Sequence, residues 1–311
     1  MRTALVGVGQ VGAALAYGAL TAGVSRELTL VDYNVERTRA NLLDLRHCQP
    51  WGNPVALNQA ETIEACEGHD LLVVSASMPA APTEGRMELL KRNAELFSRI
   101  IPELARRNPG AVLLVITNPV DVMTRLALEF SGFPPERVFG TGTTLDSARF
   151  REVLSRRLGL SPSNIHAHVI GEHGDTEVLV WSRAHAGPFS VFEFAERVGR
   201  PLDAGDVAAI SHEVRSIAYS IMASKGNTAF AIAETTLRLM RALRGRLPGL
   251  FTVTRALGAV EGKGDLCMSL PCMVSGEGAQ GPFPLDLSAE ERGAFAHSAS
   301  VLEAAYDRLG L

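Results

Sequence analysis

The sequence predicts an α/β protein in which a doubly wound parallel sheet is followed by a second, α+β domain. In the first half, apolar strand-like runs alternate with helical patterns, a glycine-rich turn follows the first run, and the alternation stops near the middle of the chain. The chain has 311 residues, 46% of them hydrophobic and 21% charged, so it exceeds the usual size of one compact domain. We therefore expect two domains, residues 1–141 and 142–311.

The expected elements follow from short apolar runs and from helical periodicity. In the first domain we expect strands at residues 3–8, 28–32, 70–75, 111–117 and 138–140. The intervening helices are expected at residues 11–22, 35–47, 87–107 and 120–130. In the second half we expect helices at 147–158 and 206–226, a short strand before Gly171, and β-rich segments near 251–254 and 266–274. Ligands of doubly wound sheets bind at the carboxyl ends of the strands, which here carry Gly7, Asp32, Ser75 and Asn118.

The glycine-rich turn has the spacing of a phosphate-binding loop. It reads Gly7-Val8-Gly9-Gln10-Val11-Gly12 and lies between the first strand and the first helix. Gly7 permits the tight turn, Gly9 lets the backbone approach a pyrophosphate, and Gly12 lets helix and strand pack closely, while the helix N-terminus attracts the anion. This is the fingerprint of a dinucleotide-binding Rossmann domain.

Asp32 strengthens that prediction and favours one dinucleotide. It ends the second strand, twenty residues after Gly12, where an acidic side chain meets the adenosine ribose hydroxyls. A carboxylate there repels a 2′-phosphate, and the next residues, Tyr33 and Asn34, offer no Arg to accommodate one. We therefore expect NAD as the cofactor. The expected cofactor-binding residues are Gly7, Gly9, Gln10, Val11, Gly12, Asp32, Ser75 and Asn118.

Charge and cysteine content favour small substrates and a reducing compartment. The net charge is −4, and no basic run or interleaved basic and aromatic stretch occurs, which argues against a nucleic-acid partner. The four cysteines have no metal-ligand spacing, so we expect reduced thiols in the cytoplasm and no metal. The apolar N-terminus resembles a signal peptide, but its glycines are placed for the phosphate turn, and no run is suited to span a membrane.

The segments Leu145–Arg149 and Gly171–Asp175 supply the groups of a candidate active site. His173 changes charge near neutral pH, and a buried Asp can fix its tautomer and stabilise its protonated form. The planar fork of an Arg matches a carboxylate with two parallel hydrogen bonds. This set suits the reduction of a 2-oxo acid, in which hydride transfer leaves alkoxide character on oxygen and a proton donor and a cation must converge there.

Five motifs together resemble the L-lactate/malate dehydrogenase family over nearly the whole chain, most closely its bacterial NAD-dependent L-lactate dehydrogenases. They are the glycine loop with Asp32, Thr117–Asp121, Leu145–Arg151, Gly171–Asp175 and Lys225–Thr228, in the family's order. The resemblance implies that His173 is the acid/base, Asp146 its orienting carboxylate and Arg149 the clamp on the substrate carboxylate. It also implies a contact from Asn118 to the substrate carbonyl and nicotinamide region.

The same resemblance implies that Arg86, on a loop that closes over the site, polarises the reacting carbonyl. One position on this loop departs from the family. Lactate dehydrogenases usually carry Gln six residues before the loop Arg and malate dehydrogenases carry Arg, whereas this chain has Ala80. L-Lactate dehydrogenase, acting on pyruvate with NADH, is the favoured function. A dehydrogenase of broader specificity for branched-chain 2-oxo acids, a malate dehydrogenase and a non-catalytic NAD-binding homologue are the alternatives.

Three further residues agree with the predicted L-lactate dehydrogenase function. Arg151 and His166 match positions at which allosteric members bind fructose 1,6-bisphosphate between subunits, and basic side chains suit a sugar phosphate. Thr228 matches a position beside the substrate methyl. The resemblance therefore implies a regulated glycolytic enzyme that forms a homotetramer.

Overall fold

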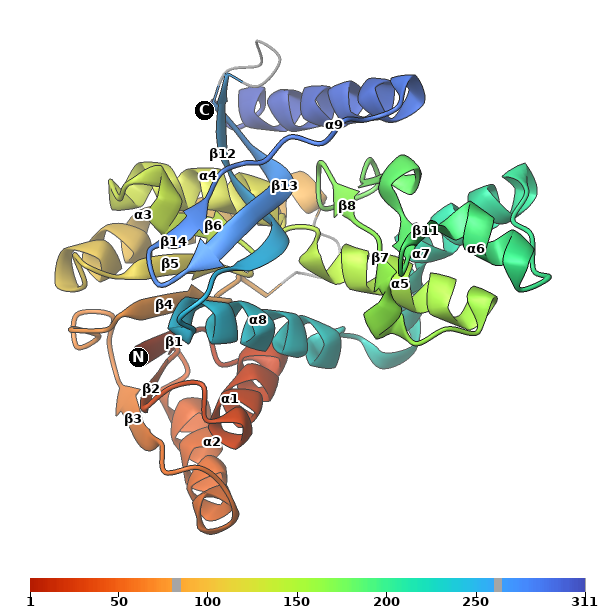
Figure 1. Ribbon diagram of the computed structural model, residues 1–311. Coiled ribbons are helices and arrows are strands. Elements are labelled where there is room, and N and C mark those ends of the chain that lie inside the picture. The colour runs from red at the N-terminus through yellow and green to blue at the C-terminus, as the bar shows by residue number, and fades with distance from the viewer. Residues whose placement is uncertain (80–84, 260–264, 311) are drawn as a thin grey trace.

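The computed structural model describes residues 1–79, 85–259 and 265–310, which fold around one large twisted sheet with helices on both faces (Figure 1). The strand order is β14-β13-β12-β6-β5-β4-β1-β2-β3. The fold class expected from the sequence is confirmed.

The first half of the chain forms the parallel part of this sheet. Its strands are β1 (Arg2–Val6), β2 (Glu27–Val31), β3 (Ala56–Ala60), β4 (Leu71–Val74), β5 (Val112–Val115) and β6 (Val138–Gly140). They lie in the order 3-2-1-4-5-6, which is that of a dinucleotide-binding sheet. The helices between them are α1 (Gln10–Ala22), α2 (Val35–Cys48), α3 (Arg86–Arg107) and α4 (Val120–Ser131). All nine predicted elements are present.

Strand β3 is a strand of this half that the sequence did not predict. Its sequence, Ala-Leu-Asn-Gln-Ala, has no β-branched or aromatic residue, so local propensity does not favour a strand. It forms at the sheet edge because it pairs in parallel with β2 along its whole length. Leu57 and Ala60 are its buried residues.

Alternating side chains of the parallel strands divide the interior into two cores. In β1, Ala4 and Val6 belong to the core under α3, α4 and α9 (Ala289–Asp307), while Leu5 belongs to the core under α1 and α8 (Ala229–Arg244). This is the burial pattern of strands covered on both faces, and it explains why they appear in the sequence as short continuous apolar runs.

The second half extends the same sheet. Strands β12 (Gly249–Ala259), β13 (Asp265–Ser275) and β14 (Gly278–Gln280) form an antiparallel meander, and β12 pairs with β6 through Thr254 and Gly140. The β-rich segments expected from the sequence therefore continue the central sheet past the parallel strands. This continuity brings Thr252 and Ser269 next to the start of α5 (Thr144–Leu158).

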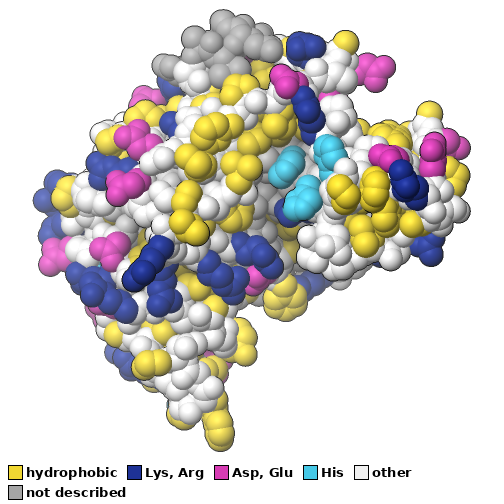
Figure 2. Space-filling view, in the orientation of Figure 1, with side chains coloured by type: hydrophobic (Ala, Val, Ile, Leu, Met, Phe, Trp, Pro, Cys, Tyr) yellow, Lys and Arg dark blue, Asp and Glu magenta, His cyan; other side chains and the backbone are white. Residues whose placement is uncertain are grey.

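The remaining elements form a smaller unit around a third core, in which Phe150 is fully buried. It contains α5, α6 (Val191–Arg197) and α7 (Ala204–Lys225), with short strands β7 (Ile165–His166), β8 (Val169–Ile170), β9 (Val178–Leu179), β10 (His185–Ala186) and β11 (Phe189–Ser190). Histidine side chains gather near the junction of this unit with the main body (Figure 2). No helix in the described ranges is long and apolar enough to cross a membrane.

Candidate active site

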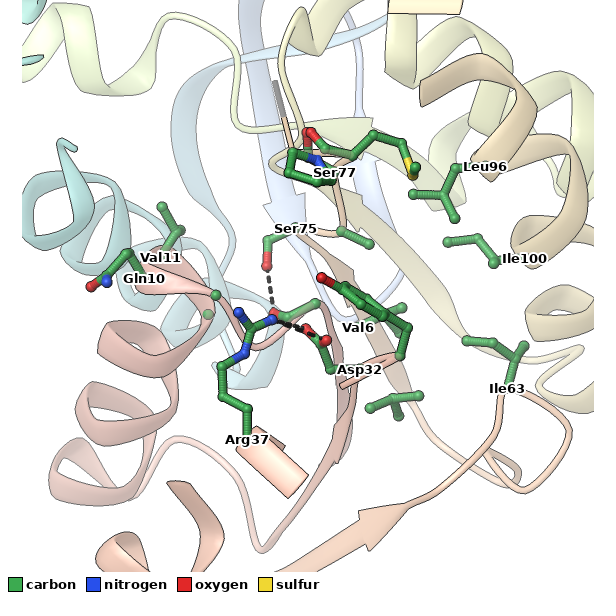
Figure 3. Close-up of a pocket in the computed structure, with 18 of the residues that line it drawn as sticks. Val6, Gln10, Val11, Asp32, Arg37, Ile63, Ser75, Ser77, Leu96 and Ile100 are labelled. Atoms are coloured by element: carbon green, nitrogen blue, oxygen red, sulfur yellow. Dashed lines mark hydrogen bonds and ion pairs between the residues drawn. The ribbon is translucent and has the colours of Figure 1, made fainter. Parts of the chain in front are cut away.

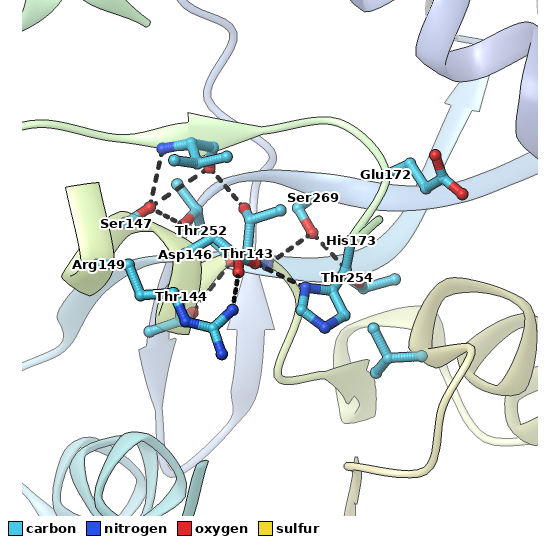
Figure 4. Close-up of polar contacts among 12 residues, drawn as sticks. Thr143, Thr144, Asp146, Ser147, Arg149, Glu172, His173, Thr252, Thr254 and Ser269 are labelled. Atoms are coloured by element: carbon cyan, nitrogen blue, oxygen red, sulfur yellow. Dashed lines mark hydrogen bonds and ion pairs between the residues drawn. The ribbon is translucent and has the colours of Figure 1, made fainter. Parts of the chain in front are cut away.

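A histidine and an aspartate from distant segments meet at the centre of the site. Asp146 lies in the first turn of α5, and His173 lies in the loop between β8 and β9. His173 Nδ1 is 2.6 Å from Asp146 Oδ2 (Figure 4). The carboxylate is 2% exposed and the imidazole 23%, so Asp146 is buried behind a histidine that reaches solvent. The contact fixes Nδ1 as the protonated nitrogen and leaves Nε2 for a substrate.

The loop that carries His173 is fixed by elements from the end of the chain. Gly171 exchanges two backbone hydrogen bonds of 2.9 Å with Ser269 of β13, and the Glu172 N–H donates to Ser298 Oγ of α9 at 2.8 Å. Gly171 has φ +90°, and a Cβ there would lie 2.8 Å from Ser298 Oγ. Glycine is therefore required at this position for both its backbone conformation and the space available.

Charge within the site favours a protonated histidine. Burial alone lowers the pKa of His173, but the Asp146 carboxylate outweighs burial and, with more distant carboxyl groups, raises that pKa to about 9. Burial likewise acts to raise the pKa of Asp146, but the charges of His173 and Arg149 outweigh it and lower that pKa. At neutral pH the pair is an imidazolium held by a carboxylate, which is an acid ready to donate a proton.

Asp121 holds the backbone of the catalytic loop. Its Oδ2 accepts a 2.7 Å hydrogen bond from the His173 backbone N–H, and its Oδ1 accepts one from the Thr254 hydroxyl. Burial raises the pKa of Asp121 to about 6. The sequence placed Asp121 in a motif without giving it a role, because its contacts to β12 and to the His173 loop depend on the extended sheet.

Glu177 is a second buried carboxyl group beside the pair. It is 4% exposed, and its Oε1 has no hydrogen-bond partner among the described residues. Burial raises its pKa to about 8, with a further contribution from Asp146. Sequence reasoning missed Glu177, although its position four residues after His173 was a signal. A neutral Glu177 avoids placing another negative charge next to Asp146.

Arg149 presents a cation at the same place. It lies one helical turn after Asp146 on α5, and its Nη1 donates to Asp146 Oδ1 at 2.7 Å. Its Nε and Nη2 have no hydrogen-bond partner within the described part of the chain. The side chain is 11% exposed, so Arg149 is a largely buried guanidinium with donors left for an anionic ligand.

The glycine loop opens onto a separate cavity of about 600 Å³ at the carboxyl ends of β1, β2 and β4 (Figure 3). It is lined by the predicted cofactor residues Gly7, Gly9, Gln10, Val11, Gly12, Asp32 and Ser75. A Cβ on Gly12 would lie 2.0 Å from the Gly7 carbonyl oxygen, whereas a Cβ on Gly9 would meet no atom within 4 Å. Gly12 is thus needed for packing, and Gly9 leaves open space at the start of α1 that fits a pyrophosphate.

Asp32 occupies the position that the motif predicted. Its Oδ2 accepts the Val8 backbone N–H at 2.6 Å, and its Oδ1 accepts that of Asn34 at 2.9 Å. Arg37 of α2 also reaches Asp32, with its Nη2 at 3.1 Å from both carboxylate oxygens. Sequence reasoning missed Arg37 because it considered only the two residues that follow Asp32.

Three other predicted residues lie at the ends of helices or strands. Asn118 is exposed at the end of β5, where its Oδ1 accepts the Val120 N–H at 3.2 Å. Thr228 is the N-cap residue of α8, and Arg86 begins α3 with a side chain that is not described. Ala80 lies outside the described residues. The roles of these four residues stay predictions.

Arg151 of α5 and His166 of β7 belong to a group of basic side chains that also includes His168 and Arg238. Arg151 Nε donates to the Ser147 carbonyl oxygen at 3.1 Å, and burial together with the Arg238 charge lowers the pKa of Arg151. Burial also lowers the pKa of His168, and the charges of Arg151 and His166 lower it further. In the described ranges no cluster of three or more His, Cys, Asp or Glu side chains is arranged to hold a metal ion.

Both halves of the chain are similar to known proteins of one family. Residues 1–140 match the family model of the lactate/malate dehydrogenase NAD binding domain, and residues 143–309 match that of the lactate/malate dehydrogenase alpha/beta C-terminal domain. An L-lactate dehydrogenase of Thermus aquaticus is 41% identical over 310 residues, and one of Geotalea daltonii is 39% identical over 314, each alignment covering 100% of both chains.

Solved structures show the same likeness in three dimensions. A minor L-lactate dehydrogenase of Enterococcus mundtii in a ligands-bound form matches with a TM-score of 0.93 and 32% identity over 98% of this chain and 97% of its own. A lactate dehydrogenase from a deep-sea metagenome of the Medee basin matches with a TM-score of 0.94 and 28% identity, over 100% of this chain and 99% of its own.

Proposed function

The chain belongs to the lactate/malate dehydrogenase family, and we propose that it is an NAD-dependent L-lactate dehydrogenase that reversibly reduces pyruvate to L-lactate. The observation that carries this proposal is the His173–Asp146 pair at 2.6 Å, with Arg149 bound to the other oxygen of the same carboxylate. A proton donor and a carboxylate-binding cation are thereby held by one buried group.

Each residue of the proposed site has a separate role in the reaction. Bound NADH supplies the hydride. Arg149 binds the substrate carboxylate through its remaining donors, and His173 donates a proton from Nε2 to the carbonyl oxygen as charge develops there. Asp146 keeps Nδ1 protonated and stabilises the imidazolium, while Asp121 holds the loop backbone. In the reverse direction, neutral His173 accepts the hydroxyl proton of lactate.

Four further residues, whose roles come from the family resemblance, complete the proposed site. Arg86 polarises the carbonyl when the loop closes, Asn118 contacts the carbonyl and nicotinamide region, and Thr228 lies beside the substrate methyl. Ala80 takes the place of the usual specificity residue at the distal end of the substrate. Nothing in the described structure favours malate, a longer 2-oxo acid or a non-catalytic role, and the sequence retains His173, Asp146, Arg149 and Arg86.

Replacing His173 with Asn tests the chemical assignment. We expect pyruvate reduction to fall by about a hundredfold or more, because the proton donor is lost, while NADH binding is retained because the phosphate loop is separate. Asp175→Asn is the matched control, since Asp175 lies in the same loop, is exposed and contacts Tyr219. Near-native turnover in the His173 variant would refute the assignment.

We further propose a regulated homotetramer in which Arg151 and His166 bind fructose 1,6-bisphosphate between subunits. The basic group on α5 and β7 supports this, because Arg151 lies near other cations and donates to a backbone carbonyl, so an anion would relieve their repulsion. Exposed apolar side chains on α7 and α8, Tyr219, Met222 and Phe230, supply surface for subunit contacts. None of the four cysteines forms a disulfide within the described residues, which supports a cytoplasmic location.

The effector proposal predicts activation that depends on Arg151. Fructose 1,6-bisphosphate should lower the KM for pyruvate of the wild-type chain and shift its mass towards a tetramer in sedimentation. Arg151→Gln should abolish both effects, and Arg157→Gln, a change on the same helix at an ion pair with Asp206, should not. If the effector changes neither quantity in the wild type, the regulatory site is absent.

A further inference from the structure

We propose that Arg37 lets the adenosine end of the cofactor cavity accept a ribose 2′-phosphate, so that the chain binds NADPH as well as NADH, with NADH preferred. The inference rests on the proposed function, in which this cavity holds the dinucleotide. The motif alone favoured NAD over NADP, because Asp32 repels a 2′-phosphate and Tyr33 and Asn34 offer no cation. The fold supplies one from the next helix.

The position of Arg37 follows from the capping of α2. Asn34 is the N-cap residue, and its side chain accepts a 2.9 Å hydrogen bond from the Arg37 backbone N–H. This places Arg37 in the first turn of the helix, where side chains point back towards the preceding turn and hence towards the end of β2. The guanidinium lies over Asp32, and both residues line the cavity that contains Gly9 (Figure 3).

The contacts around Asp32 reduce its power to exclude a phosphate. Two backbone N–H groups and Arg37 Nη2 all donate to this one carboxylate. Its negative charge is therefore largely compensated, and the repulsion of a 2′-phosphate is weaker than for a free carboxylate.

The guanidinium retains donors that a phosphate can use. Its Nε and Nη1 have no hydrogen-bond partner among the described residues, and the side chain is 43% exposed at the cavity. A guanidinium binds phosphate oxygens through parallel charge-assisted hydrogen bonds, which suits this position. Asp32 and Glu61, which also lines the cavity, still oppose the added charge, so NADH remains the better ligand.

Calorimetric binding of ADP-ribose and 2′-phospho-ADP-ribose tests this without the reaction, because neither probe carries a nicotinamide. We expect the wild type to bind both, with ADP-ribose tighter. Arg37→Ala should weaken 2′-phospho-ADP-ribose by about tenfold or more, the loss of one charge-assisted contact, and change ADP-ribose by less than about threefold. Arg39→Ala is the matched control, because Arg39 is an exposed cation of the same helix, paired with Glu36 and outside the lining of this cavity.

A second variant separates the two opposing side chains. Asp32→Ser should tighten 2′-phospho-ADP-ribose, and adding Arg37→Ala in that background should remove the gain. The inference is overturned if Arg37→Ala weakens both probes equally, weakens neither, or if the wild type binds ADP-ribose but not its 2′-phosphate. Failure of ADP-ribose itself to bind would instead overturn the assignment of the cavity in the proposed function, and the inference with it.

Discussion

Asp146→Asn should move the pH dependence of pyruvate reduction, because Asp146 is the chief group that raises the pKa of His173. That pKa rises from its ordinary value of 6.5 to about 9, although burial alone would lower it. The difference corresponds to about 3.4 kcal/mol in favour of the imidazolium, at about 1.36 kcal/mol per pKa unit. Without the carboxylate, burial is no longer outweighed, and the pKa should fall to 6.5 or below.

The size of the loss should therefore depend on pH. At pH 7.5 about 97% of His173 is protonated in the wild type and about 9% or less in the variant, a loss of at least about tenfold from protonation alone. At pH 6 a group with a pKa of 6.5 is still about three-quarters protonated, so the loss from this cause shrinks. The assay is kcat/KM for pyruvate between pH 5.5 and 10 at saturating NADH.

The control is Asp175→Asn, which removes a carboxylate of the same loop that contacts Tyr219. Its profile should follow the wild type, with activity falling only near pH 9. A constant loss at all pH values in Asp146→Asn, with the upper limb unmoved, would mean that Asp146 acts through geometry alone and would refute the electrostatic reasoning.

Four other substitutions test residues that support the active site and the phosphate loop. The pKa of Glu177 is raised to about 8, so between pH 5 and 8 the folded state binds a proton that the unfolded state has released, and the protein loses stability as the pH rises. Glu177→Gln should therefore flatten the fall of Tm over this pH range. An unchanged Tm profile would show that Glu177 ionises normally. Asp121→Asn should lower kcat for pyruvate reduction several-fold while NADH affinity is retained, because an NH2 group replaces one of the carboxylate oxygens that hold the His173 loop. Weaker NADH binding in this variant would contradict the assignment. Gly9→Val should weaken NADH binding at nearly unchanged Tm, because a side chain there would enter open space. Gly12→Ala should lower Tm, because its Cβ would lie 2.0 Å from a carbonyl oxygen. Equal effects of the two changes on Tm would contradict the different roles given to these glycines.

The sequence predicted the parts of the molecule that depend on local patterns. The glycine loop and Asp32 have fixed spacing, and short apolar strands between helices specify a parallel sheet. The helices and most strands of the nucleotide-binding half could therefore be predicted from the sequence. His173, Asp146 and Arg149 were recognised by residue type and motif, and the structure brings all three together.

What the sequence did not predict depends on contacts between distant segments. Strand β3 has weak strand propensity and forms through its pairing with β2. The continuation of the sheet into β12 and β13 depends on Thr254 meeting Gly140 across more than a hundred residues. Arg37 and Glu177 gain their importance only where helix capping and burial bring them beside Asp32 and the His173 pair.

The central claim is tested most directly by comparing kcat/KM for the NADH-dependent reduction of pyruvate, oxaloacetate and 2-oxoisocaproate, with the chirality of the pyruvate product determined. We predict that pyruvate exceeds each of the other two by at least about tenfold, equivalent to about 1.4 kcal/mol, and that its product is L-lactate. A higher kcat/KM for oxaloacetate or 2-oxoisocaproate, a D-lactate product, or no reduction of any of the three would contradict the proposed function.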